Sequence, residues 1–180
     1  MASAQTHSPR PELRLYAPVG QAARQRKQRR ELAAQVARYL GAVSILLVGA
    51  VHAQQYYEAY FSIVPTIGTL FLLSFIGAGV VGTVLFMPLR RLGRRRGDLI
   101  LSLAAIGAIG IALGTLVSLL ISEYMPLFGF MESGYRLAVV LTLLFDGLTT
   151  VFLGVFLVIV GPQLIRAFRA VHGEHQAARP

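Results

Sequence analysis

The 180-residue chain contains no cysteine and no tryptophan. Without cysteine it has no disulfide, no thiolate nucleophile and no cysteine ligand for a metal. Without tryptophan, the aromatic side chains that anchor a protein at a membrane surface must be Tyr or Phe. The common catalytic motifs are also missing, since the sequence has no phosphate-binding glycine motif, no GxSxG and no HExxH. We therefore predict no enzymatic activity, no catalytic residue, no cofactor and no metal site.

Acidic residues are scarce, with 8 Asp and Glu against 17 Lys and Arg, and Lys27 is the only lysine. In a soluble protein a net charge of +9 would suggest a nucleic-acid partner. Here the basic side chains flank apolar runs, so we expect them to contact anionic lipid headgroups and expect no nucleic acid. The strong preference for Arg over Lys, together with abundant Ala and Gly, is typical of a GC-rich bacterial genome.

Long apolar runs dominate the rest of the chain, which is 55% hydrophobic with a mean hydropathy of +0.62. A hydrocarbon core about 30 Å thick is crossed by about 20 helical residues. Four runs reach that length, at residues 39–57, 61–87, 99–121 and 137–160. The sequence therefore predicts an all-α polytopic membrane protein that forms an antiparallel four-transmembrane-helix bundle.

The predicted organisation is one transmembrane domain at residues 31–165 between two polar tails. Residues 1–30 lack apolar periodicity and are predicted to be a disordered basic tail, with a basic helix beginning near Gln21 and running into the first span. Residues 166–180 form the second tail. Small residues recur in the third and fourth spans and predict close helix packing, or alternatively contacts between copies: Gly110, Gly114 and Ser118; Ala104, Ala108 and Ala112; Gly147, Gly154 and Gly161. Pro162 is expected to kink or end the fourth helix.

The basic residues predict the orientation of the chain. All except Arg136 lie before the first apolar run, in the connection 88–98 or after the fourth run. Short segments rich in Arg stay in the cytoplasm, so we expect both termini in the cytoplasm of a bacterium and the spans in its plasma membrane. One alternative remains open. The pair Arg29 and Arg30, followed by an apolar run, resembles a signal peptide with cleavage after Ala53, which would leave three spans.

Asp146 is the most informative residue for function. It lies ten residues after Arg136, which places it about 15 Å below the outer surface and near the bilayer centre. A charged carboxylate there costs about 2.5–3.5 kcal/mol on insertion scales, so the group is expected to be protonated, paired or hydrated. Thr142, Thr149 and Thr150 share its helix face. This stripe indicates either a proton or cation site, or a neutral Asp that hydrogen-bonds to a Thr or a carbonyl and fixes helix packing.

His52 and Tyr56 lie four residues apart on one helical face near the outer boundary. Histidine changes charge near neutral pH, so His52 is a candidate proton or redox ligand. The alternative is an interfacial polar residue within an aromatic belt. The other histidines lie in the tails, so the sequence offers no second axial ligand for a haem within one chain.

The two outer connections carry the remaining candidate site residues: Glu58 in the first, and Glu123, Glu132 and Arg136 in the second. The second connection is apolar, yet Pro126 and Gly129 break regular helix, so it must lie at the interface, cap the bundle or bind a partner. In an up-down bundle both connections meet at one end. We expect either a shallow ligand-binding cup with an acidic rim or a simple cap.

The stretch Val51 to Leu73, with His52, an aromatic cluster and the sequence PTIG, and the later sequence PLFGF at residues 126–130, resemble small four-helix integral membrane proteins of actinobacterial type, which are largely uncharacterised. The resemblance covers residues 35–165. It implies the four-span architecture and a plasma-membrane location, and it implies no activity, cofactor or catalytic residue.

Two functions follow as hypotheses. The first is a membrane binding or assembly component that acts through its outer loops and helix seams, with the lipid bilayer, a second copy or another membrane protein as partner. The second is a small, oligomeric proton-coupled carrier or redox-associated module that uses Asp146 and His52.

Overall fold

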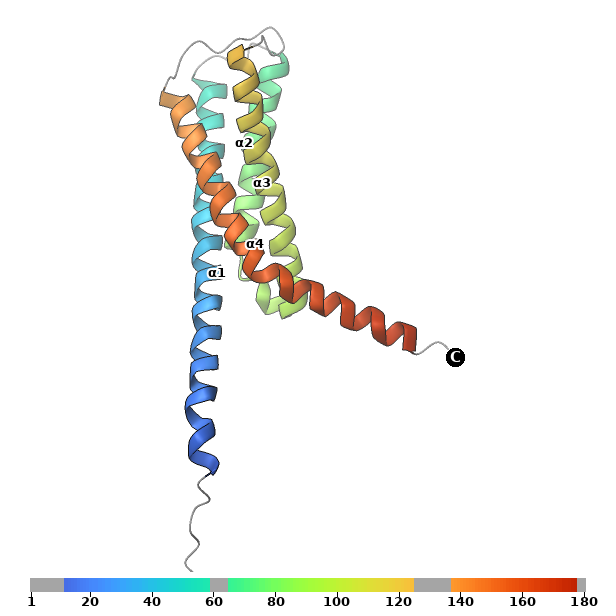
Figure 1. Ribbon diagram of the computed structural model, residues 1–180. Coiled ribbons are helices and arrows are strands. Elements are labelled where there is room, and N and C mark those ends of the chain that lie inside the picture. Colours follow the sequence, from blue (N-terminus) through green and yellow to red (C-terminus); the bar gives the residue numbers. More distant parts are fainter. Residues whose placement is uncertain (1–11, 59–64, 125–136, 178–180) are drawn as a thin grey trace, which may run out of the picture. The chain divides into compact units, whose positions relative to one another are not determined.

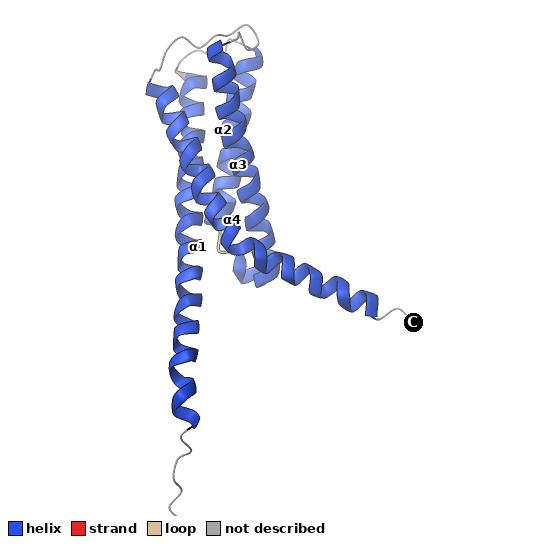
Figure 2. Cartoon of the chain, viewed as in Figure 1, coloured by secondary structure: helices blue, strands red, loops and turns tan. Residues whose placement is uncertain are grey.

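The computed structural model describes residues 12–58, 65–124 and 137–177. Within these ranges the backbone is helical and contains no strand (Figure 1 and Figure 2). The elements, in chain order, are α1 Glu12–Tyr57, α2 Pro65–Phe86, the short 3-10 helix η2 Leu89–Leu92, α3 Arg94–Tyr124 and α4 Leu137–Ala177.

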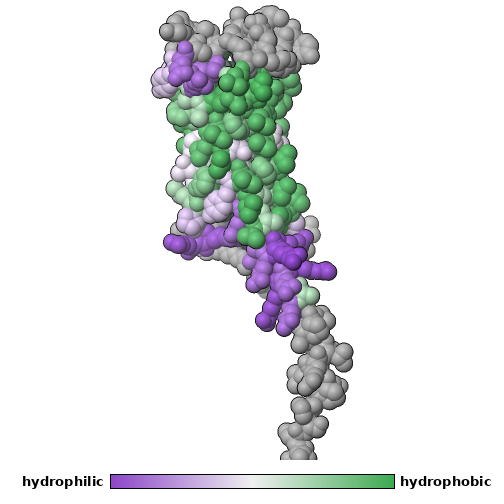
Figure 3. Space-filling model, turned by 90° about the vertical axis from the view of Figure 1, so that its left-hand side faces the viewer, coloured by the Kyte–Doolittle hydropathy of each residue, from purple (hydrophilic) through white to green (hydrophobic). Residues whose placement is uncertain are grey.

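Four of the described helices are long and apolar enough to cross a membrane, over Gln21–Tyr57, Thr66–Phe86, Arg95–Ser122 and Leu137–Pro162. They coincide with the four runs expected from the sequence. Their outward faces are apolar: Val80, Leu103 and Val158 are 59%, 60% and 75% exposed. Figure 3 shows the result on one face, an apolar belt with hydrophilic side chains at either end. Helices that are apolar all round are typical of membrane spans.

Contacts divide the chain into two units, Met1–Ala33 and Ala34–Pro180. In the first unit the side chains of residues 21–30 are all exposed, including five basic ones: Arg24, Arg26, Lys27, Arg29 and Arg30. Helix α1 begins at Glu12, so helical backbone covers much of the segment 1–30 that we expected to be disordered. From Gln21 onward this segment consists of Ala, Gln, Arg and Lys, which have high helix propensities.

The second unit is a bundle in which successive helices run in opposite directions (Figure 1). A Cβ built at Gly41 on α1 would overlap the side chain of Leu153 on α4. A Cβ at Gly49, on the next turns of α1, would lie 3.1 Å from Cβ of Ala78 on α2. Small residues at these points therefore allow α1 to approach both neighbours closely, as expected where dispersion drives helix packing in lipid.

The small residues of α3 fall on two different surfaces. Ala108 and Ala112 are fully buried in the core, so the predicted alanine ridge packs inside the bundle. The glycine line behaves differently, because a Cβ at Gly110 or Gly114 would meet no atom within 4 Å. The same holds for Gly147, Gly154 and Gly161 on α4. Our expectation of close packing at these glycines is therefore wrong for a single chain. A glycine leaves space beside its helix, but a neighbouring helix does not have to occupy that space.

Prolines and one glycine set the helix boundaries. Pro65 begins α2, where its missing N–H is not needed. Pro88 disfavours helical backbone in the residue before it, and α2 ends at Phe86. The chain then turns through η2 to Gly93, whose φ of 107° favours glycine. Pro162 lies inside α4, and Figure 1 shows that helix changing direction toward its carboxyl end, so the predicted kink is present and the helix continues.

Candidate ligand pocket

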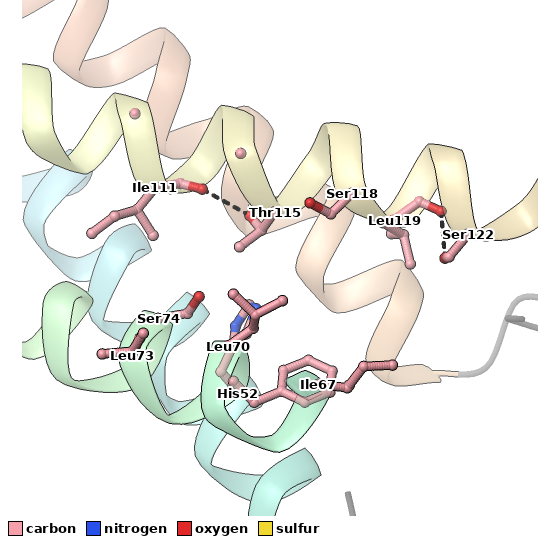
Figure 4. Close-up of a pocket in the computed structure, with 13 residues that line it drawn as sticks. His52, Ile67, Leu70, Leu73, Ser74, Ile111, Thr115, Ser118, Leu119 and Ser122 are labelled. Atoms are coloured by element: carbon pink, nitrogen blue, oxygen red, sulfur yellow. Dashed lines mark hydrogen bonds between the residues drawn. The ribbon is translucent and has the colours of Figure 1, made fainter. Parts of the chain in front are cut away.

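A pocket of about 430 Å³ lies between α2 and α3, with one side chain contributed by α1. Its apolar wall consists of Ile67, Leu70, Phe71, Leu73, Ile111 and Leu119. Its polar side chains are His52, Ser74, Thr115, Ser118 and Ser122, and Gly110 and Gly114 complete the lining. Figure 4 shows α2 and α3 facing each other across this space, with His52 reaching it from α1.

The glycines of α3 explain why the space is open. Gly110 and Gly114 are four residues apart, so they lie one above the other on the same helix face. Neither position has an atom within 4 Å of where a Cβ would stand. Close to the Arg-rich connection at residues 88–98, by contrast, Leu101 and Ala105 of α3 are fully buried. The pocket therefore occupies the half of the bundle that contains the start of α2 and the end of α3.

His52 is buried within the bundle. Its Nδ1 lies 2.8 Å from the carbonyl oxygen of Val48, one turn earlier on α1. Because a carbonyl can only accept, Nδ1 carries the proton in this bond, and in the neutral ring Nε2 then keeps a lone pair. The imidazole packs against Phe71 of α2, with ring centroids 5.3 Å apart and planes at 57°. The bond and the ring contact together hold the imidazole at the pocket wall.

Thr115 connects the pocket to Asp146. Its Oγ1 lies 2.6 Å from Oδ2 of Asp146 on α4, and also 3.1 Å from the carbonyl of Ile111 and 2.9 Å from that of Ala112. A hydroxyl has one proton, so Thr115 donates to one of these acceptors at a time. The shortest contact, to the Asp146 carboxyl oxygen, is in the range of a charge-assisted O–H···O bond.

Asp146 is fully buried, and its second oxygen Oδ1 has no hydrogen-bond partner among the described residues. Thr149, one turn away on α4, is also fully buried, and its Oγ1 lacks a partner in the same part of the chain. Thr150 donates to the backbone carbonyl of Asp146 at 2.9 Å, not to its carboxyl group. The hydrogen-bond partner of the Asp146 carboxyl group is therefore Thr115 on α3, and not a threonine of α4. Sequence reasoning did not identify this partner.

The other predicted site residues do not join this pocket. Tyr56 is partly buried and packs edge-on against Tyr57, with ring centroids 5.0 Å apart. Glu58 is exposed and accepts a hydrogen bond from Nε2 of Gln54 at 3.1 Å. Glu123 belongs to α3, but its side chain lies outside the described part of the structure, as do Glu132 and Arg136 entirely. The expected outer cup is thus beyond the described residues.

Within the described residues, no group of three or more His, Asp or Glu side chains is placed to hold a metal ion. Apart from Asp146 and His52, the pocket half of the bundle offers hydroxyl groups and apolar carbon, which suit a small amphipathic molecule. Sequence inspection did not point to Thr115, Ser118 and Ser122, although isolated hydroxyls at intervals of three and four in an apolar span are a detectable signal.

No family model, no curated protein and no solved structure matches this chain.

Proposed function

We propose that this chain is a multi-pass protein of a bacterial plasma membrane that binds a small amphipathic molecule in the α2–α3 pocket without chemically changing it. It is a binding or assembly component of the membrane, similar in type to the small four-helix integral membrane proteins of actinobacteria. Its partners are the lipid bilayer and, at the Arg clusters, anionic lipid headgroups. A second copy or another membrane protein binds along the open glycines of α4, which are Gly147, Gly154 and Gly161.

The proposed orientation has both termini in the cytoplasm. It is supported by the Arg-rich connection 88–98, which lies at the same end of the bundle as the bend of α4 (Figure 1). Arg91 and Arg95 in this connection are exposed. Because Arg in short segments is retained in the cytoplasm, this end faces inward and the pocket lies in the outer half of the membrane.

Single cysteines test this orientation cleanly, because the chain has no cysteine of its own. We expect Glu58→Cys to react with a membrane-impermeant maleimide in intact cells, and Arg91→Cys to react only after the cells are opened. Both positions are exposed, so accessibility on the protein is matched. Labelling of Arg91→Cys in intact cells would overturn the proposed orientation. If neither variant were labelled in opened cells, the two positions would not be exposed and the structure would be wrong at these residues.

The pocket itself is the observation that carries the binding proposal. Its volume of about 430 Å³ is within the range of about 300–1,000 Å³ typical of small-molecule sites, and its mixture of an apolar wall with a few polar groups is also typical. A buried histidine, fixed by one bond to the backbone, is an unusual element of a lipid-exposed bundle unless it serves a ligand or stabilises packing.

Filling the pocket tests the proposal. Gly110→Leu places a side chain in the pocket, and the new Cβ meets no atom within 4 Å, so the bundle can accommodate it. Gly79→Leu is the matched control, because it is the same change at another open glycine outside the pocket lining. Native mass spectrometry of protein released from nanodiscs should show a bound small molecule on the wild type and on Gly79→Leu, but not on Gly110→Leu. Equal occupancy of all three would refute binding in this pocket.

A second candidate is a small proton-coupled carrier, favoured by the fully buried Asp146 and its unpartnered Oδ1. Intramembrane carboxyl groups commonly mark proton pathways. In vesicles loaded with a pH-sensitive dye, the wild-type protein would then couple solute entry to a pH change in the vesicle interior. Asp146→Asn would abolish that signal, because the amide cannot exchange a proton. Solute-driven pH changes of equal size in both proteins would remove this candidate.

A further inference from the structure

Three of the polar side chains that line the pocket have their protons directed away from it. The proton on Nδ1 of His52 is engaged by the Val48 carbonyl at 2.8 Å. Ser122 donates to the carbonyl of Leu119 at 2.7 Å. Thr115 donates to Asp146 or to a carbonyl of its own helix. Three of the five polar side chains in the lining are therefore left with lone pairs only, and so act as acceptors toward a ligand.

The backbone adds few donors to compensate. Except for Ile67 in the first turn of α2, every lining residue lies far enough inside a helix for its N–H group to bond to a carbonyl of the same helix. The hydroxyls of Ser74 and Ser118 can rotate to donate or accept. The fixed polarity of the site is thus that of an acceptor surface, with Nε2 of His52 as its strongest base.

From this arrangement we propose that the pocket selects apolar molecules that carry a hydroxyl group, because only a hydrogen-bond donor on the ligand satisfies Nε2 of His52 and the oxygens of Thr115 and Ser122. This inference rests on the proposed binding function and specifies its ligand. Apolar molecules whose polar group is an acceptor only, such as an ether, an ester or an oxidised quinone, are bound less well. Such a group can accept only from a rotatable hydroxyl such as that of Ser74 or Ser118, and it leaves Nε2 of His52 without a partner.

The apolar wall determines the rest of the ligand. Leu70 and Leu73 on α2 are 45% and 59% exposed although they line the pocket, so the site opens at a lipid-facing surface. Phe71 and His52 together present two aromatic rings beside the acceptor nitrogen. A phenolic head, as in a hydroquinone, can pack against these rings while its hydroxyl reaches Nε2. A long-chain alcohol supplies the same donor without a ring.

Two probe pairs test the inference. Each pair differs only in whether the oxygen carries a proton: para-nonylphenol against its methyl ether, and dodecanol against its methyl ether. Binding is measured by equilibrium dialysis to nanodiscs that contain the protein, with empty nanodiscs subtracted to remove partition into lipid. One net hydrogen bond predicts that the hydroxyl member binds about three- to tenfold more tightly in at least one pair. A preference confined to the phenol pair identifies the aromatic class, and one confined to the alcohol pair identifies the aliphatic class.

His52→Phe assigns the preference to the histidine. It keeps a planar ring beside Phe71 but removes the lone pair, so the ratio between the two members of a pair should fall to about one while the ethers still bind. Ser44→Ala is the control, because Ser44 is a buried serine of the same helix that bonds to the carbonyl of Leu40 and does not line the pocket. It should keep the wild-type ratio.

The failures of the two proposals are distinguishable. Equal binding of hydroxyl and ether in the wild type, with both lost in Gly110→Leu, would overturn the donor preference and leave the pocket as a binding site. Tighter binding of the ethers would do the same. Absence of binding above empty nanodiscs for all four probes would overturn both proposals. The wild-type comparison needs no variant, so it decides the question even where His52→Phe does not fold.

Discussion

Removal of the Thr115 hydroxyl should destabilise the bundle more than removal of both partners of its bond to Asp146. Thr115→Val keeps the shape of the side chain but deletes the donor that lies 2.6 Å from Oδ2. Since Oδ1 already lacks a partner among the described residues and Asp146 is fully buried, both carboxyl oxygens are then unpaired in an apolar interior. An unsatisfied buried polar group costs about 1–3 kcal/mol, more when it is charged.

The double variant follows a different balance. Asp146→Val removes the buried carboxyl group, and in that single variant Thr115 still donates to the carbonyl of Ala112 at 2.9 Å. In Thr115→Val with Asp146→Val neither polar group remains, and replacing both partners by apolar groups of similar shape is nearly neutral. We therefore expect the double variant to recover about 1 kcal/mol or more of the stability lost in Thr115→Val. This recovery is larger than the mean contribution of about 0.6 kcal/mol for hydrogen bonds between helices in a membrane.

The assay is reversible unfolding of the four proteins from mixed micelles of increasing denaturing detergent, followed by circular dichroism. The four unfolding free energies form a double-mutant cycle, which isolates the pairwise term between the two side chains. A double variant less stable than Thr115→Val would refute the reasoning, because it would mean that the carboxyl group stabilises the fold without its α3 partner. Strict additivity of the two single effects would refute the interhelical bond itself.

Two further predictions concern the connection between α2 and α3. Gly97→Ala should lower the free energy of unfolding by about 1–3 kcal/mol, because the new Cβ would lie 2.5 Å from the carbonyl oxygen of Leu89. Gly79→Ala is the control and should not lower it, because its Cβ meets nothing within 4 Å. Equal melting temperatures of the two variants would contradict the geometry. Arg90→Gln should lower stability by about 1 kcal/mol more than Asp98→Asn. The 2.7 Å ion pair joins an Arg90 side chain that is 30% exposed to an Asp98 side chain that is 7% exposed. Arg90→Gln leaves the more buried charge, that of Asp98, without its partner, and a buried unpaired charge costs more than an exposed one. Thermal unfolding in mild detergent measures both differences, and the reverse order for the ion pair would show that Asp98 has another source of stabilisation.

The positions of the four spans were predictable because the length of an apolar run is a strong signal on its own. Pro162 also behaved as expected, since the effect of a proline on a helix is local. The surroundings of Asp146 were predictable in part: a bond to a threonine hydroxyl was one of the alternatives considered, but the threonine is on α3. Contacts between helices depend on rotation and depth of each helix, which local patterns do not encode.

His52 illustrates the same limit. Its place near the end of the first apolar run did not indicate that it is buried against Phe71 of α2. The glycines of α3 and α4 suggested close helix contacts, but at Gly110, Gly114 and Gly154 the neighbouring space is open. The outer connections, which hold Glu132 and Arg136, stay a prediction, since they are outside the described residues.

What the sequence determined by itself is the approximate position of each long apolar helix, because crossing about 30 Å of hydrocarbon demands a minimum length and excludes unpaired backbone groups. What only the tertiary structure decided is which face of each helix is inside. In a soluble protein the buried face is the apolar one, but here the outward side is apolar as well, so hydropathy carries almost no information about burial. The rotation of each helix about its axis brings Thr115 next to Asp146 and places the hydrogen-bond acceptors around the pocket. The sequence pattern does not determine that rotation.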